Sequence, residues 1–136
     1  QLAANQIECA GYMGVKATRA RTKENRFEFK NVRTEALWRF REALDPSQPG
    51  RSPVALPPSV TLKADLSAPK YTVKGHGDGA VLVAESKEEV CSRLGRSTDE
   101  GDAVIMAYYK GIKQANVVGG WSRQGGLPVV QRGKRY

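Results

Sequence analysis

Prolines place the strongest constraint on the fold of this 136-residue chain, because five of its seven prolines lie between Pro46 and Pro58. Proline lacks the backbone N–H that helix interiors and central strands require. We therefore predict a rigid, extended connector over 47–59 that no helix or central strand can cross. The chain must be built from short elements on either side of it, and its length suits one compact domain.

Upstream of this connector, the segment 32–44 has the clearest helical pattern. Asn31 can cap it, and Asp45-Pro46 ends it. Its apolar residues recur at helical spacing: Val32, Ala36, Leu37, Phe40 and Leu44. We read 2–6 as the end of a helix, 7–17 as a buried strand, and the polar, basic segment 18–30 as a loop.

Downstream, the pattern predicts a helical turn or two over 60–66 and a β-hairpin with strands at 70–74 and 80–84. Three glycines between 75 and 79 supply the turn, in which we read the lone His76 as a turn residue. The order of elements predicts an α/β fold with a mixed sheet.

Two capping boxes then predict two helices. The first, Ser86 to Glu89, opens a helix that reaches Leu94 and is closed by Gly95. The second, Ser97 to Glu100, opens the last helix. Its predicted core stripe is Ala103, Val104, Ala107, Tyr108 and Ile112.

Positive charge is the main compositional signal, with 22 Lys and Arg against 14 Asp and Glu and a net charge of +8. It is concentrated between 16 and 41 and after Asp102, where no further acid occurs. We expect a polyanion, most simply a nucleic acid, as the partner; the alternative is an ordinary solvated surface. The apolar runs are too short to cross a membrane. Cys9 and Cys91 lie far apart, so we expect reduced thiols in an intracellular protein.

Familiar catalytic motifs are missing from the sequence. The glycines around His76 lack the Lys-Ser/Thr of a phosphate-binding loop, and His76 has no nearby Cys or second His for a zinc site. Asp99 and Asp102 remain, on one face at the start of the last helix. The helix dipole explains Asp99, whereas Asp102 adjoins the apolar run 103–107 and, if half-buried, needs a partner or a cation such as Mg²⁺ or Mn²⁺. The alternative is that both acids only begin the helix.

Four ordered blocks of sequence resemble one protein family. They are RTEALWRFREALDP at 33–46, VALPP at 54–58, VAESKEE at 83–89 and LGRSTDEGDAV at 94–104. Blocks of this kind occur in this order in the large terminase subunits of tailed bacteriophages, and the similarity covers most of 15–107. The last block has Thr98 where the family pattern, Ser-Pro-Asp-x-x-Asp-Ala, has proline.

The resemblance implies an RNase H-like nuclease fold: a mixed sheet flanked by helices, with a β-hairpin insertion. Residues 1–118 would form the C-terminal portion of that domain, and 119–136 a flexible basic tail. The family cuts concatemeric double-stranded DNA by two-metal hydrolysis with Mg²⁺ or Mn²⁺. Asp102 falls on a metal-binding acid of the last helix, Asp99 on a neighbouring supporting position, and Lys87 on a lysine near the scissile phosphate. For Lys87, an exposed helix start is the alternative.

Two of the three acidic ligands that the family uses have no counterpart here, because Glu8, Glu24 and Glu28 do not match them. We therefore expect an excised, incomplete domain that is inactive or nearly so by itself.

The resemblance also implies partners for the chain and a place in the cell. We expect Arg19, Arg21, Lys23 and Arg26 to contact the DNA backbone, and the tail from Arg123 to Tyr136 to contact the portal or procapsid. The location would be the cytoplasm of the infected bacterial host. The alternatives are a non-catalytic basic DNA-binding or packaging-assembly module, and an unrelated small nuclease or resolvase with an RNase H-like core.

Overall fold

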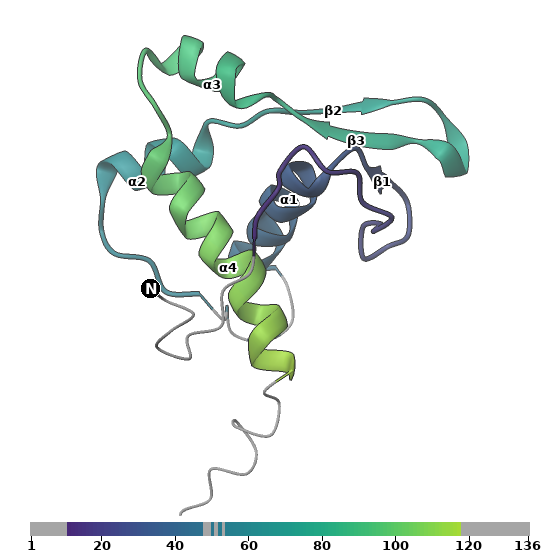
Figure 1. Cartoon of the computed structure of the whole chain (residues 1–136), viewed down its shortest axis with the longest axis horizontal. Helices are drawn as coiled ribbons and strands as arrows, with labels where there is room; N and C mark the ends of the chain where they lie inside the picture. The colour runs from purple at the N-terminus through teal and green to yellow at the C-terminus, as the bar shows by residue number, and fades with distance from the viewer. Residues whose placement is uncertain (1–10, 48–49, 51, 53, 118–136) are drawn as a thin grey trace, which may run out of the picture.

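A computed structural model describes residues 11–47, 50, 52 and 54–117 of the chain, and only the backbone of 110–117 (Figure 1). It confirms a mixed α/β fold, with four helices and a three-stranded sheet in the described part. The elements in chain order are β1 (Glu28–Phe29), α1 (Val32–Leu44), α2 (Val60–Ser67), β2 (Tyr71–Lys74), the 3₁₀ turn η2 (Gly77–Gly79), β3 (Val81–Ala84), α3 (Lys87–Leu94) and α4 (Asp99–Val117).

The sheet has the strand order β1-β3-β2. The predicted hairpin is confirmed: β2 and β3 are antiparallel, with Tyr71 opposite Ala84 and Lys74 opposite Val81. Gly75 supplies the positive φ of +83° at the turn. The segment 18–30 is not wholly a loop, because β1 within it pairs in parallel with β3. Two residues are too few for an alternating pattern to show in the sequence.

Helix α1 confirms the helix predicted over 32–44. It lies at the centre of the fold and packs against β1, β3 and α4. The Asn31 side chain accepts a hydrogen bond from the Thr34 amide at 2.9 Å. Leu37 and Phe40 of α1 pack against Ile105 and Tyr109 of α4 in the main cluster of buried residues. Figure 1 shows α4 running beside α1 and α2, while the hairpin extends away from them.

The predicted core stripe of α4 is correct in part, because Val104 and Tyr108 are partly buried and pack against the core. Ala103 and Ala107 are exposed, and the residues buried against α1 are Ile105 and Tyr109. The side chain of Ile112 lies outside the described residues. The helix presents this neighbouring face because its first turn is fixed on α2, which sets its rotation.

The predicted strand over 7–17 is also wrong where it can be examined. Residues 11–17 form a turn and irregular chain, and residues 1–10, with the predicted helix end at 2–6, lie outside the described residues. The carbonyls of Gly14 and Lys16 accept the amides of Arg33 and Val32, each at 2.9 Å. This segment therefore completes the start of α1 and does not extend the sheet.

The two predicted capping boxes have different outcomes. Ser86 and Glu89 form the reciprocal hydrogen bonds of a capping box, and Gly95, with φ +69°, ends α3. Helix α4 does begin near the second motif, but its first residue is Asp99 and the box is not formed. The Glu100 carboxylate, which the box required, instead accepts a hydrogen bond at 3.2 Å from Ser59, the N-cap residue of α2.

Helix α4 is joined to α2 through the buried carboxylate of Asp65, which is 3% exposed. One oxygen accepts the Gly101 amide at 3.2 Å, and the other pairs with Arg96 at 2.6 Å. Asp65 thus satisfies one of the amides that the first turn of a helix leaves unpaired. A Cβ atom on Gly101 would lie 2.7 Å from the Asp65 Cβ, so the two helices meet where only glycine fits.

We predict that Gly101→Ala destabilises the fold by about 1–3 kcal/mol, the usual cost of overpacking. The sign of the stability change tests the close approach, because a Gly→Ala change inside an unconstrained helix stabilises a protein by up to about 1 kcal/mol. Urea unfolding followed by circular dichroism measures the change. Gly79→Ala is the control, since its Cβ would meet nothing within 4 Å. A Gly101→Ala variant more stable than wild type would contradict the close approach of α2 and α4.

Candidate functional site

The structure brings together three residues that the sequence singled out: Lys87, Asp99 and Asp102. Lys87 is the first residue of α3 and Asp99 the first of α4. The Lys87 Nζ lies 2.9 Å from Asp102 Oδ2 and 3.1 Å from Asp99 Oδ1. One ammonium group therefore bridges two carboxylates. We call these three residues the Lys87 cluster.

The depth of the cluster increases from Asp99 to Asp102. The Asp99 side chain is 78% exposed, that of Lys87 41% and that of Asp102 23%. Buried Thr98 donates its hydroxyl to Asp102 Oδ2 at 3.2 Å, so this oxygen is held by two donors. The expected half-buried Asp102 with a partner is thus observed, and that partner is Lys87.

The charges of the cluster stabilise one another. Hydrogen bonds to Asp102 and Asp99 raise the pKa of the Lys87 ammonium well above its ordinary value. Hydrogen bonds from the Ser97 hydroxyl and from Lys87 lower the pKa of Asp99. The positive end of the α4 dipole favours both acids, whereas the same end of α3 disfavours a lysine. The acids therefore hold Lys87 at a helix position where it would otherwise be unfavourable.

Beside the cluster lies a groove with a volume of about 530 Å³, and Lys87 and Asp102 are among its lining residues. Tyr12, Lys30 and Arg33 line it too, from segments that the sequence did not connect with the site. The lining residues carry three cationic side chains against two carboxylates, those of Glu88 and Asp102. Such a groove suits an anionic ligand such as a phosphate.

Tyr12 and Arg33 form the wall of this groove next to Asp102. Arg33 donates to the Glu85 carbonyl at 2.5 Å, which ties α1 to the end of β3. The Tyr12 ring packs edge-on against Tyr109, with ring centres 6.0 Å apart. Burial raises the pKa of Tyr12, the charge of Arg33 opposes this, and the charge of Asp102 adds to it. The phenol is thus a neutral donor and acceptor close to the acid.

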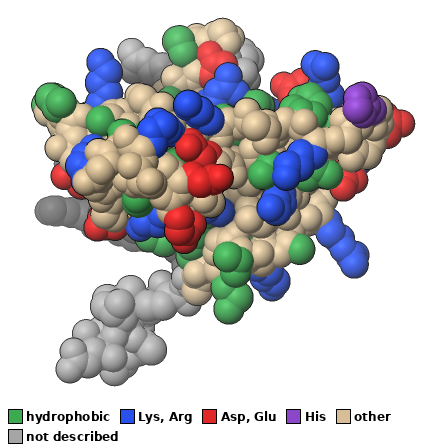
Figure 2. Space-filling view, turned by 90° about the horizontal axis from the view of Figure 1, so that it is seen from above, with side chains coloured by type: hydrophobic (Ala, Val, Ile, Leu, Met, Phe, Trp, Pro, Cys, Tyr) green, Lys and Arg blue, Asp and Glu red, His purple; other side chains and the backbone are tan. Residues whose placement is uncertain are grey.

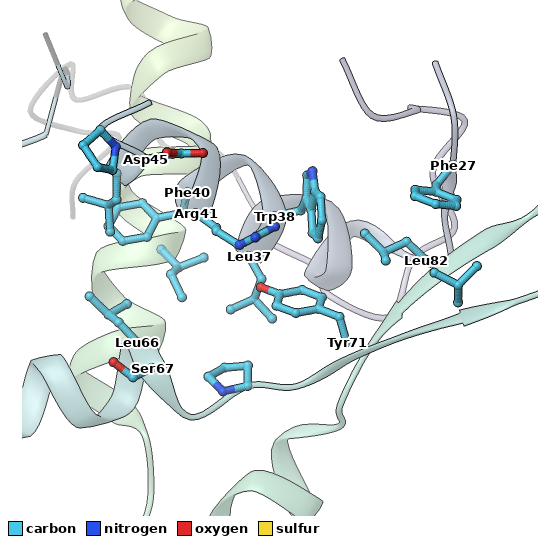
Figure 3. Close-up of a pocket in the computed structure, with 15 residues that line it drawn as sticks. Phe27, Leu37, Trp38, Phe40, Arg41, Asp45, Leu66, Ser67, Tyr71 and Leu82 are labelled. Carbon is cyan, nitrogen blue, oxygen red and sulfur yellow. The ribbon is translucent and has the colours of Figure 1, made fainter. Parts of the chain in front are cut away.

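A second cavity, of about 840 Å³, is different in character (Figure 3). It lies between α1 and the hairpin and is lined mainly by apolar and aromatic residues, among them Phe27, Leu66 and Leu82. Figure 3 shows Trp38 and Tyr71 close together, and their rings pack edge to face with ring centres 5.3 Å apart. Its lining includes Asp45 and Arg41 but none of the residues of the Lys87 cluster.

The basic residues predicted to contact DNA are partly engaged within the fold. Arg21 pairs with Glu28 at 3.0 Å and donates to the Asp78 carbonyl at 2.6 Å. Lys23 lies 3.9 Å from Glu42. Arg26 lies over the Phe27 ring, and both Arg26 and Arg19 are exposed. On the face that Figure 2 displays, Lys and Arg side chains are likewise interspersed with acidic ones.

Within the part of the chain that the structure describes, no three His, Cys, Asp or Glu residues are grouped so that they could hold a metal ion. Glu28 pairs with Arg21, away from the cluster. Glu8 and Cys9 lie outside the described residues, and Cys91 carries a free thiol. The two carboxylates that the Lys87 ammonium bridges thus come from the single helix α4, and Glu88 of α3 is the other acid that lines the groove.

Comparisons with known proteins add no assignment. No protein-family model, no characterised protein and no solved structure significantly matches the chain. Among the described helices, none has the combination of length and apolar character needed to cross a membrane.

We predict that the fold loses stability in acid because several carboxyl groups are more acidic when it is folded. The pKa of Glu85 is lowered mainly by a hydrogen bond from Arg93, and the pKa values of Glu89 and Asp99 are also lowered. Their stabilisation is present at neutral pH. It is lost as the pH falls below the ordinary pKa values, 4.5 for glutamic acid and 3.8 for aspartic acid, because the unfolded chain then binds more protons. Urea unfolding at several pH values between neutral and about pH 3 measures how steeply the free energy of unfolding falls with pH, which we call the acid slope.

Two variants test the Glu85 contribution to that slope. Glu85→Gln removes the titrating group, and Arg93→Gln removes the donor that lies 2.6 Å from it. Both should make the acid slope shallower than that of the wild type. Equal slopes in all three proteins would show that this pair does not cause the acid sensitivity.

Proposed function

We propose that this chain is the C-terminal part of the nuclease domain of a tailed-bacteriophage large terminase subunit, with an RNase H-like fold. In this proposal Asp102, supported by Asp99, contributes to a Mg²⁺ or Mn²⁺ site at which double-stranded DNA is hydrolysed. The observation that carries it is the Lys87 cluster. Lys87 and the two acids lie in separate sequence blocks, yet they meet within 3.1 Å at the side of a groove.

The donor set suits a hard divalent cation. Two carboxylates and the Ser97 and Thr98 hydroxyls give oxygen ligands, which Mg²⁺ and Mn²⁺ prefer. The carboxylates already bind one cation between them, the Lys87 ammonium. A metal bound there would activate water and stabilise charge at a phosphate. A two-metal site needs more acids than α4 provides, so the remainder must come from another segment or chain.

The chain's own residues have separate tasks in this proposal. Asp102 would hold the cation, and buried Thr98 fixes one of the Asp102 oxygens by donating a hydrogen bond to it. Lys87, Lys30 and Arg33 line the same groove and attract a phosphate of the strand. Tyr12 narrows the groove beside the acid. The strand is therefore oriented through its backbone, without reading its sequence.

A second candidate is a non-catalytic DNA-binding or packaging-assembly module. The net charge of +8 and the small number of clustered acids favour it. It shares the groove and the phosphate contacts with the nuclease but requires no metal. Metal binding therefore separates the two functions.

We predict that Mn²⁺ binds the full chain and that Asp102→Ala abolishes the binding, as measured by calorimetric titration. The variant should lose only about 1 kcal/mol of stability or less, because partly exposed ion pairs contribute little. Asp78→Ala, at an exposed acid of the hairpin turn, should retain wild-type binding. Undiminished Mn²⁺ binding in Asp102→Ala, or severe unfolding with no effect of metal, would mean that Asp102 has a structural role only.

We further predict DNA binding that is independent of sequence and steeply weakened by salt. Fluorescence anisotropy with two unrelated duplexes over a range of salt concentrations measures both properties. Replacing exposed Arg19 or exposed Arg26 with alanine should in each case reduce the slope of log affinity against log salt concentration by about one. Lys63→Ala, on α2, is the control. Binding that does not respond to salt would refute the phosphate contacts.

A further inference from the structure

We infer that Lys87 is a built-in counter-cation of the proposed metal site, and that a divalent ion must displace it before binding Asp102 and Asp99 together. This inference rests on the proposed function and concerns the regulation of that same site. Lys87 and the metal ion would therefore compete for the same two carboxylates.

The geometry of the ammonium group carries the argument. Nζ lies at hydrogen-bonding distance from one oxygen of each acid, 2.9 Å for Asp102 and 3.1 Å for Asp99. A cation that contacted the same two oxygens would occupy the place of the ammonium. Two positive charges that close repel strongly, so the lysine and the metal exclude one another at this bridging position.

The lysine is well placed to leave. Its side chain is 41% exposed on a flexible four-carbon stem, so a released ammonium returns to water at little cost. Its backbone position at the start of α3 is fixed by the Ser86 cap and does not depend on the ion pairs. The exchange therefore moves one side chain and leaves α3 and α4 in place.

The displaced ammonium remains beside the groove, which Lys87 also lines together with Lys30 and Arg33. Freed from the carboxylates, it can face a bound phosphate. Loading the metal thus changes Lys87 from a ligand of the acids into a cation available to the substrate. In the absence of metal, the same contact offsets one of the two negative charges and occupies the position between the acids that another cation would take.

The competing explanation is that Lys87 only joins α3 to α4. Under that explanation its removal lowers stability and leaves the affinity for a metal unchanged or weaker. Under the exchange, its removal raises that affinity. The two explanations therefore predict different metal affinities when Lys87 is removed.

The experiment compares Mn²⁺ affinity in wild type, Lys87→Met and Lys30→Met by calorimetric titration. Lys30 lines the same groove, has an exposed side chain, and is not paired with either acid in the structure. Its removal reproduces the loss of one positive charge and controls for long-range attraction. We expect Lys87→Met to bind Mn²⁺ roughly 3- to 30-fold more tightly than wild type, since two partly exposed ion pairs no longer compete. Lys30→Met should change the affinity much less.

Two further variants guard against misfolding and charge effects. Lys87→Gln keeps a polar side chain at the start of α3 and should also tighten Mn²⁺ binding. Lys87→Arg retains a cation and should stay close to wild type. Thermal unfolding of each variant verifies the fold before titration.

The outcomes separate the two proposals. Tightening confined to the variants that remove the cation at position 87 supports the exchange. Equal affinities in Lys87→Met and Lys30→Met, with binding still lost in Asp102→Ala, overturn the exchange and leave the metal site standing. Absence of Mn²⁺ binding from every variant overturns the proposed function and the exchange with it.

Discussion

The burial of Asp65 against the first turn of α4 is the constraint on which the rest of the site depends. A carboxylate that is 3% exposed is costly unless its charge is paired and its oxygens are hydrogen-bonded. The Arg96 guanidinium pairs with the charge at one oxygen, and the Gly101 amide donates a hydrogen bond to the other. Arg96 precedes α4, and Gly101 lies in its first turn. Because Asp102 follows Gly101 directly, the contact that seats α4 on α2 also sets the direction of the acid. The site therefore has a rigid acid and, in Lys87, a flexible partner.

The helix dipoles explain why the acids and the lysine are held in different ways. Asp99 and Asp102 stand in the first turn of α4, where the unpaired amides favour negative charge. Lys87 stands in the equivalent turn of α3, where they oppose positive charge. The contact between α3 and α4 at this point is therefore stable only while the two carboxylates offset the unfavourable interaction of Lys87 with the dipole of α3. A cation that satisfies the acids removes the reason for the lysine to stay.

Most local signals in the sequence predicted their elements correctly, and the exception is the Ser97 to Glu100 box, whose Glu100 accepts a hydrogen bond from Ser59 instead. The Asn31 cap, the hairpin glycines and the Ser86 box each involve neighbouring residues, so the elements they bound were predicted correctly. Two predictions failed in part because tertiary contacts decided the outcome. Residues 11–17 of the predicted strand form backbone hydrogen bonds to the start of α1. Ala103 and Ala107 of the predicted stripe are exposed, because the contact with Asp65 sets the rotation of α4. The spacing of Asp99 and Asp102 was readable, and the resemblance pointed to Lys87. Their meeting, and the walls that Tyr12 and Arg33 supply, depend on how distant segments pack.

The distribution of charge in the groove bears on what the chain can do by itself. Its three cationic side chains outnumber the two carboxylates, and one of those cations is engaged by Asp102 and by Asp99. The groove is therefore better suited to a phosphate than to a pair of metal ions. Further acids brought to the same place would reverse this balance, neutralise the cationic side chains more completely and favour a metal ion. In the proposed function, carboxylates added to Asp102 would therefore decide between binding of a strand alone and its cleavage, and the phosphate contacts would be the same in both cases.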